Sequence, residues 1–113
     1  MKLFEPLAIR HMTLKNRVIM SPMATNFGYN NPVARAYYVA RAKGGVGAII
    51  LGGAPVDAFL SDKFLTDINH WLVNPIHQYG AMLAPQLWYG NQYPIWSSPG
   101  RGQAWVAPSA GSP

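Results

Sequence analysis

Three apolar runs in this sequence each end at, or contain, residues that could contact a ligand. The first lies in residues 13–23 (TLKNRVIMSPM), where a polar turn leads into a short apolar run that ends in Ser-Pro-Met. A strand ending there offers backbone amides and carbonyls at its carboxyl end, where ligands of α/β proteins bind. The second run ends at Gly52-Gly53, and the third contains Gln86.

Gln86 and Gly53 suit polar contacts for different reasons. A neutral amide inside an apolar strand costs free energy unless it is hydrogen-bonded, so Gln86 needs a partner, either a ligand or a group of the protein itself. Gly53 has no Cβ, so its backbone can approach a ligand closely, although glycine serves equally well in an ordinary turn. Pro22 and Met23 have an equally plain interpretation, as a strand-ending proline and a core methionine.

Other site chemistries find little support. The sequence has no cysteine, which excludes disulfides, thiolate metal sites and a cysteine nucleophile within it. His11, His70 and His77 lack metal-ligand spacing, and no carboxylate lies near them in a metal-binding pattern. We therefore expect no metal site.

Composition indicates a folded protein with no nucleic-acid or membrane partner. Half of the 113 residues are hydrophobic and 12% are charged, which favours a buried core. The formal charge is +5, but the nine basic residues never form the clustered patch typical of nucleic-acid binding. No apolar stretch reaches the roughly 18 residues of a membrane span, and the opening MKLFEP lacks the apolar run of a signal peptide. These features fit a cytoplasmic protein.

Strands alternate with helices in the expected order. Three strands are predicted, over residues 17–21, 46–51 and 82–88, because each is a short apolar run typical of strands covered on both faces. Before them, residues 3–9 should be extended and residues 11–16 should form a polar turn.

The first helix is predicted over residues 33–43, with Val33, Tyr37 and Ala40 on its apolar face. Gly44-Gly45 supplies the left-handed stop that commonly ends a helix. A loop over residues 54–66 and a second helix over residues 67–79 should follow.

Pro75 complicates the second helix. In a helix interior it would remove a hydrogen bond. It could instead be the first residue of a short helix capped by Asn74. Beyond the third strand, residues 89–113 are rich in Gly, Pro, Ser and aromatic residues and are predicted to be an irregular loop tail.

Strand–helix–strand–helix–strand order predicts parallel strands joined by right-handed crossovers. Three such strands leave two open edges, which are a hazard for unwanted pairing. A closed barrel needs eight strands and typically about 250 residues. We therefore expect an incomplete fold.

Several motifs occur in order over nearly the whole sequence, namely LFEPL (3–7), TLKNRVIMSPM (13–23), YY (37–38), RAKGGVGAII (41–50), QLW (86–88) and VAPSA (106–110). Together they resemble the Old Yellow Enzyme-type NADH:flavin oxidoreductases. The 2,4-dienoyl-CoA reductase branch is the most similar, particularly at Ala24-Thr25-Asn26 and Gly52-Gly53. Another flavin barrel, similar to dihydroorotate dehydrogenase, is less favoured by the LKNR and GGVG motifs.

The resemblance implies an α/β fold, the N-terminal portion of a (β/α)8 TIM barrel with about strands 1–3 and helices 1–2. It implies FMN at the carboxyl ends of the strands, with NAD(P)H as reductant and an activated alkene or enone, such as an enoyl or dienoyl thioester, as hydride acceptor. The family's flavin contacts fall on five positions of this sequence, namely Pro22, Met23, Ala24, Gly53 and Gln86. Thr25 could contribute, although its register does not predict it.

Some family features are altered or fall outside the sequence. Where the family continues after Gln-Leu with a residue and then His-x-Gly-Arg, this sequence has WYGNQ (88–92). Ala24 replaces a hydroxyl or thiol that tunes the flavin in other members. The family's substrate-binding histidines, proton donor and phosphate-binding segments belong to later strands, and neither an iron–sulfur cluster nor FAD can be assigned. The alternative prediction is a truncated, catalytically inactive fragment of such an enzyme, with no independent function.

Overall fold

A computed structural model describes residues 2–88 of this chain, apart from the side chain of Asp57. The predicted loop tail over residues 89–113 therefore lies outside the described residues. The elements in chain order are the 3-10 helix η1 (Lys2–Phe4), β1 (Leu7–Ile9), β2 (Met12–Leu14), β3 (Ile19–Met23), α1 (Pro32–Lys43), β4 (Ala48–Pro55), α2 (Val56–Phe59), α3 (Asp62–Ile68), the π-helical turn η2 (Asn69–Val73), α4 (Asn74–His77) and β5 (Met82–Trp88).

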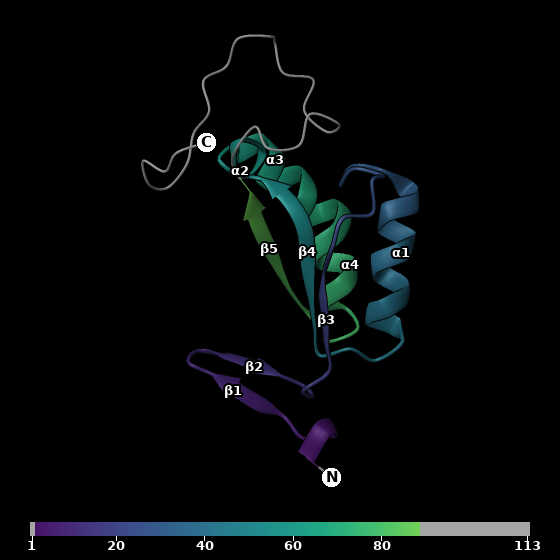
Figure 1. Cartoon of the computed structure of the whole chain (residues 1–113), viewed down its shortest axis with the longest axis vertical. Coiled ribbons are helices and arrows are strands. Elements are labelled where there is room, and N and C mark those ends of the chain that lie inside the picture. The colour runs from purple at the N-terminus through teal and green to yellow at the C-terminus, as the bar shows by residue number, and fades with distance from the viewer. Residues whose placement is uncertain (1, 89–113) are drawn as a thin grey trace, which may run out of the picture.

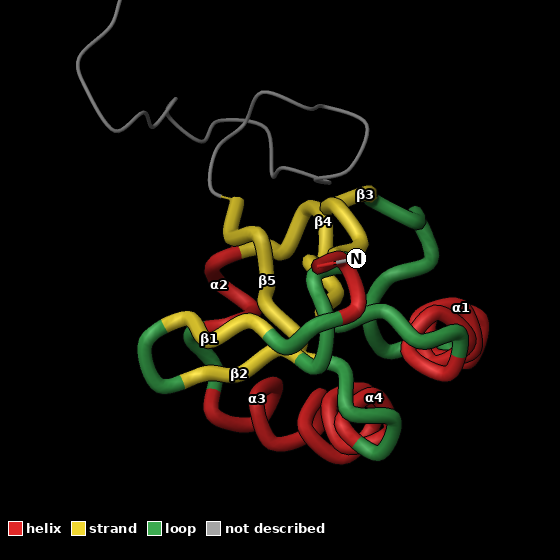
Figure 2. The backbone as a smooth tube through the Cα atoms, turned by 90° about the horizontal axis from the view of Figure 1, so that it is seen from below, coloured by secondary structure: helices red, strands yellow, loops and turns green. Residues whose placement is uncertain are grey.

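A three-stranded parallel sheet in the order β3-β4-β5 forms the centre of the fold (Figure 1). Each crossover moves one strand further in the same direction, and the helices α1, α3 and α4 all lie on one side of the strands (Figure 2). Right-handed crossovers that advance in one direction place their helices on one face, as in a barrel wall. This confirms the predicted parallel α/β arrangement, and the described residues form no closed barrel.

The core lies between the sheet and these helices. Its largest fully buried side chains include Tyr38 of α1, Ile49 and Leu51 of β4, Leu72 of η2 and Ile76 of α4. Burying such apolar side chains stabilises the fold by roughly 1.5–3 kcal/mol each.

Helix α1 has the predicted end but not the predicted buried face. It begins after Asn31, whose side chain accepts a hydrogen bond from the Val33 amide at 2.8 Å, and it ends at Lys43. Its buried residues are Ala34, Tyr38 and Ala42, whereas Val33 is 53% exposed. The predicted face was wrong because several stripes of this helix are apolar, so composition alone did not select the one facing β4.

The predicted loop over residues 54–66 was wrong, since these residues contain the end of β4, all of α2 and the start of α3. Ser61 caps α3 by accepting a hydrogen bond from the Phe64 amide, and Asp62 follows in the first turn, where negative charge is favoured. Helical structure then continues to His77.

Pro75 is accommodated by the π-helical turn η2. There the amide of Asn74 donates to the carbonyl of Asn69, five residues earlier. Pro75 then lies at the start of α4, in agreement with one predicted alternative. Asn74 is not the cap, however, because its backbone is already helical, with φ −58° and ψ −46°.

The strands agree with the sequence to different degrees. β5 has the predicted bounds, Met82–Trp88. β3 is shifted to Ile19–Met23, and Ile19 is 45% exposed rather than covered on both faces. The predicted turn over 11–16 contains strand β2, which pairs with β1 in an antiparallel hairpin that turns at Arg10 and His11.

The LKN segment (14–16) of the motif over residues 13–23 joins parts of the chain at the amino ends of the strands. The Asn16 side chain donates to the Gly45 carbonyl at 2.8 Å and accepts from the Val18 amide at 3.1 Å. The Lys15 ammonium donates to the Tyr79 carbonyl at 2.5 Å, just before β5. These two residues therefore organise the turns that precede β3, β4 and β5, at the end of the sheet opposite the candidate site.

Candidate functional site

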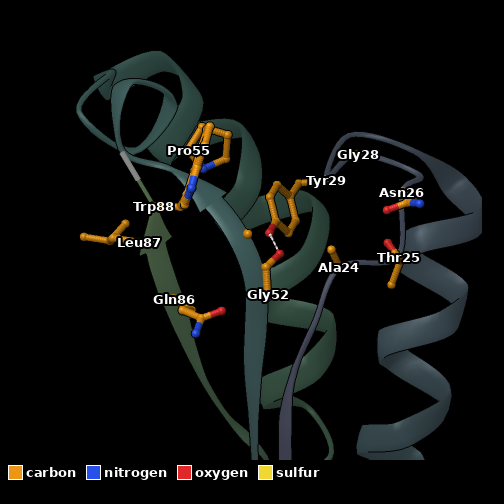
Figure 3. A pocket seen from close by; sticks show the side chains of 11 residues that line it. Ala24, Thr25, Asn26, Gly28, Tyr29, Gly52, Pro55, Gln86, Leu87 and Trp88 are labelled. Atoms are coloured by element: carbon orange, nitrogen blue, oxygen red, sulfur yellow. Dashed lines mark hydrogen bonds between the residues drawn. The ribbon is translucent and has the colours of Figure 1, made fainter. Parts of the chain in front are cut away.

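A pocket of about 690 Å³ lies at the carboxyl ends of β3, β4 and β5 (Figure 3). That volume is within the range of small-molecule and cofactor sites. The pocket is lined by Ala24, Thr25, Asn26, Gly28, Tyr29, Gly52, Gly53, Pro55, Gln86, Leu87 and Trp88.

Three of the five predicted cofactor-binding residues line this pocket. Ala24 follows β3, Gly53 lies in β4, and Gln86 lies in β5. Pro22 and Met23 lie two residues and one residue before Ala24, within β3, and are not part of the pocket wall. The structure thus brings residues from three strands together at one site, while the flavin role of all five stays a prediction.

The prediction that this strand ends at the glycine pair was wrong, because β4 continues through Gly52 and Gly53 to Pro55. The register with β5 shifts between Leu51 and Ala54, so Gly52 and Gly53 form a bulge. A Cβ on Gly52 would lie 2.6 Å from the N and C atoms of Met23, so only glycine permits this approach of β4 to β3. Gly53 has φ +64°, in the left-handed region that favours glycine.

Tyr29 crosses from the loop after β3 to this bulge. Its hydroxyl donates a hydrogen bond of 2.5 Å to the carbonyl of Gly52, as the dashed line in Figure 3 shows. Its ring meets that of Phe59 edge to face, with centroids 6.1 Å apart. Burial, together with repulsion from an ionised Tyr38, raises the pKa of Tyr29 to about 12, so the phenol stays protonated near neutral pH.

Gln86 is exposed rather than enclosed in an apolar strand, so the cost of burying its amide does not arise here. Its side chain makes no hydrogen bond within the described part of the chain, and its donor and acceptor atoms are free to meet a ligand in the pocket. Trp88, at the end of the same strand, pairs with Pro55 of β4 and adds an aromatic wall.

The loop after β3 contributes Asn26, Gly28 and Tyr29 to the pocket, and none of the three was predicted from the sequence. Asn26 and Gly28 both have positive φ, 65° and 70°, and thereby turn the loop so that Tyr29 reaches the pocket. The Asn-Phe-Gly order is a recognisable turn signal. What it could not indicate is which side chain the turn would direct toward β4.

Metal binding finds no support in the described residues, where no cluster of three or more His, Asp or Glu side chains could hold an ion. Within residues 2–88, no helix is both long and apolar enough to cross a membrane.

A parallel sheet in which each new strand is added at the same edge, with a pocket at the carboxyl ends of its strands, is typical of (β/α) barrel proteins. Residues 2–98 match the NADH:flavin oxidoreductase / NADH oxidase family, and the chain belongs to that family. The recognition made from the sequence motifs is therefore confirmed at the level of the family.

Curated relatives carry names consistent with this family. An NADPH dehydrogenase of Clostridium acetobutylicum is 36% identical over 103 residues, which cover 77% of this chain and 30% of that protein. An NADH oxidase of Thermoanaerobacter brockii is 33% identical over 95% of this chain and 18% of that protein. The chain thus spans less than a third of the length of either relative, and neither name points to the dienoyl-CoA reductase branch.

Solved structures confirm the fold class. A 6-hydroxypseudooxynicotine amine oxidase from Pseudomonas geniculata N1 superposes with a TM-score of 0.68 at 28% identity, covering 79% of this chain and 15% of that one. The old yellow enzyme from Trypanosoma cruzi superposes with a TM-score of 0.57 at 25% identity, covering 79% of this chain and 27% of that one. The described residues correspond to part of a TIM barrel.

Proposed function

We propose that the pocket at the ends of β3, β4 and β5 is one part of an FMN site in an ene-reductase-type NAD(P)H oxidoreductase. The observation that carries the proposal is the convergence of Ala24, Gly53 and Gln86 on one pocket in a chain of a flavin oxidoreductase family.

The residues present suit an isoalloxazine ring. The pyrimidine edge of flavin needs both hydrogen-bond donors and acceptors, and the Gln86 amide offers both. Gly53 leaves its backbone uncovered at the pocket wall, and the backbone after β3, at Ala24, lies beside it. Pro22 and Met23 would contribute through their backbone from the same strand end.

When bound, FMN would supply the redox chemistry, taking hydride from NAD(P)H and delivering it to the β-carbon of an activated alkene. The chain's own contribution is to hold and orient the ring. Ala24 has no hydroxyl or thiol with which to tune the flavin, so tuning would have to come from backbone groups and from Gln86. An enone or an enoyl or dienoyl thioester is the proposed substrate class, supported by the motif resemblance at Ala24-Thr25-Asn26 and Gly52-Gly53.

Titration of FMN with the 113-residue chain tests the flavin site through quenching of flavin fluorescence. Gln86→Leu should weaken binding about fivefold, because one neutral hydrogen-bonding group at a ligand is worth on the order of 1 kcal/mol. Gln78→Leu is the matched control, since Gln78 is exposed at the end of α4 and does not line the pocket.

Failure of the wild-type chain to bind FMN, or equal affinity of the Gln86→Leu variant, would overturn the flavin site. Consumption of NADPH with an enone is measured on the same samples. Binding without turnover would favour the alternative of a chain with no independent catalysis.

A further inference from the structure

Gly52 and Gly53, which form the bulge, have no register partner on either neighbouring strand. The last residues of β4 and β3 in register are Leu51 and Met23, and pairing with β5 resumes only at Ala54. Gly52 is nevertheless buried. A buried backbone carbonyl outside the ladder needs another hydrogen-bond donor.

Tyr29 supplies that donor. Its hydroxyl, 23 residues away in sequence, bonds to the Gly52 carbonyl. The peptide group between Gly52 and Gly53 is trans and planar, so the carbonyl of Gly52 and the N–H of Gly53 point in opposite directions. A bond that fixes the direction of the carbonyl therefore also fixes the direction of the Gly53 N–H.

The tyrosine is itself held in place. Its ring packs against Phe59 of α2, whose ring in turn packs against Phe64 of α3 with centroids 5.0 Å apart. The backbone of Met23 and Ala24 also lies close to Gly52, with no room for a Cβ between them. The peptide group is thus held by a close strand contact and by the hydrogen bond from the phenol.

We propose that Tyr29 is a positioning residue, whose hydroxyl orients the Gly53 N–H at the pocket wall and thereby strengthens flavin binding. The link to flavin rests on the proposed function. The orientation of the amide does not, and it can be measured without any ligand.

The test compares Tyr29→Phe with Tyr37→Phe in the isotope-labelled 113-residue chain. Tyr37 is a half-buried tyrosine of α1 that does not line the pocket. Tyr29→Phe keeps the ring packing and removes only the hydroxyl. We expect the Gly53 amide resonance to move and its hydrogen exchange to accelerate by about three- to tenfold, as for the loss of one hydrogen bond. The affinity for FMN should fall by a similar factor, and Tyr37→Phe should change neither quantity.

An unchanged Gly53 resonance and exchange rate in Tyr29→Phe would overturn the proposal, as would the same change in Tyr37→Phe. A Gly53 response with unaltered FMN affinity would overturn the link between the amide and the flavin. If Gly53 responds and the wild-type chain binds no FMN, the flavin function fails while the constraint on the peptide group is upheld.

Discussion

The Nε atom of Arg35 donates a hydrogen bond of 3.0 Å to the carbonyl oxygen of Trp71, which joins α1 to the π-helical turn η2. The guanidinium carbon also lies 5.5 Å from the centre of the Trp71 ring. In an α-helix this carbonyl would accept from the amide of residue 75, but Pro75 has no N–H. An arginine from the neighbouring helix therefore satisfies the carbonyl that proline leaves free.

Arg35→Ala should lower the free energy of unfolding by about 1 kcal/mol, the usual net value of one hydrogen bond. In a Pro75→Ala background, residue 75 regains its N–H and the same substitution should cost less than half as much. Urea unfolding of the four proteins of this double-mutant cycle measures the difference. Equal costs in the two backgrounds would show that Arg35 and Pro75 act independently.

Gly52→Ala should destabilise the chain by about 2 kcal/mol or more, because the new Cβ would meet backbone atoms of Met23 that cannot rotate away. Gly53→Ala is the comparison. Its Cβ would lie 3.7 Å from that of Ala24, an ordinary contact, so only the left-handed φ opposes it, at about 1 kcal/mol. The free energy of unfolding of each variant tests the order, and a smaller cost at Gly52 would contradict the close approach of β3 and β4.

Asn16→Ala removes the donor to Gly45 and the acceptor of the Val18 amide, and should cost about 1–2 kcal/mol of unfolding free energy. Asn16→Asp keeps the acceptor but places a carboxylate oxygen against the Gly45 carbonyl at neutral pH, so its cost should be at least as large. Neither variant should alter FMN affinity beyond the effect of unfolding, since Asn16 does not line the pocket. Chemical unfolding and flavin titration on the same samples separate the two effects.

The free energy of unfolding should decrease in alkaline solution because Tyr29 ionises. Its pKa is about 12 in the folded chain against 10.0 without the fold, so the neutral phenol is favoured by folding. This contribution is fully present below about pH 10 and is lost as the pH rises toward 12. Tyr29→Phe should therefore show a shallower decline of unfolding free energy between pH 9 and 12. Burial also raises the pKa of Tyr38, so a residual decline should persist in that variant.

Local patterns in the sequence were sufficient for several features. The bounds of β5, the end of α1 before its glycine pair and the parallel order of strands follow from apolar runs and from glycine, and each was confirmed. The motifs also identified the family correctly, because they contain residues with backbone and turn roles that few other sequences would combine. Lys15 and Asn16 are examples, since both bond to carbonyls more than 25 residues away.

Tertiary structure decided what local patterns leave open. The buried stripe of α1 is set by its packing against β4, η2 and α4. The helix through Pro75 depends on a π-turn and on Arg35 from another element. The bulge at Gly52-Gly53 and its bond to Tyr29 join residues 23 positions apart, so no local window contains both. Local patterns were sufficient for the order of the three parallel strands and for the family of this chain. Contacts between distant residues decided how Tyr29, Gly53 and Gln86 come to share one pocket.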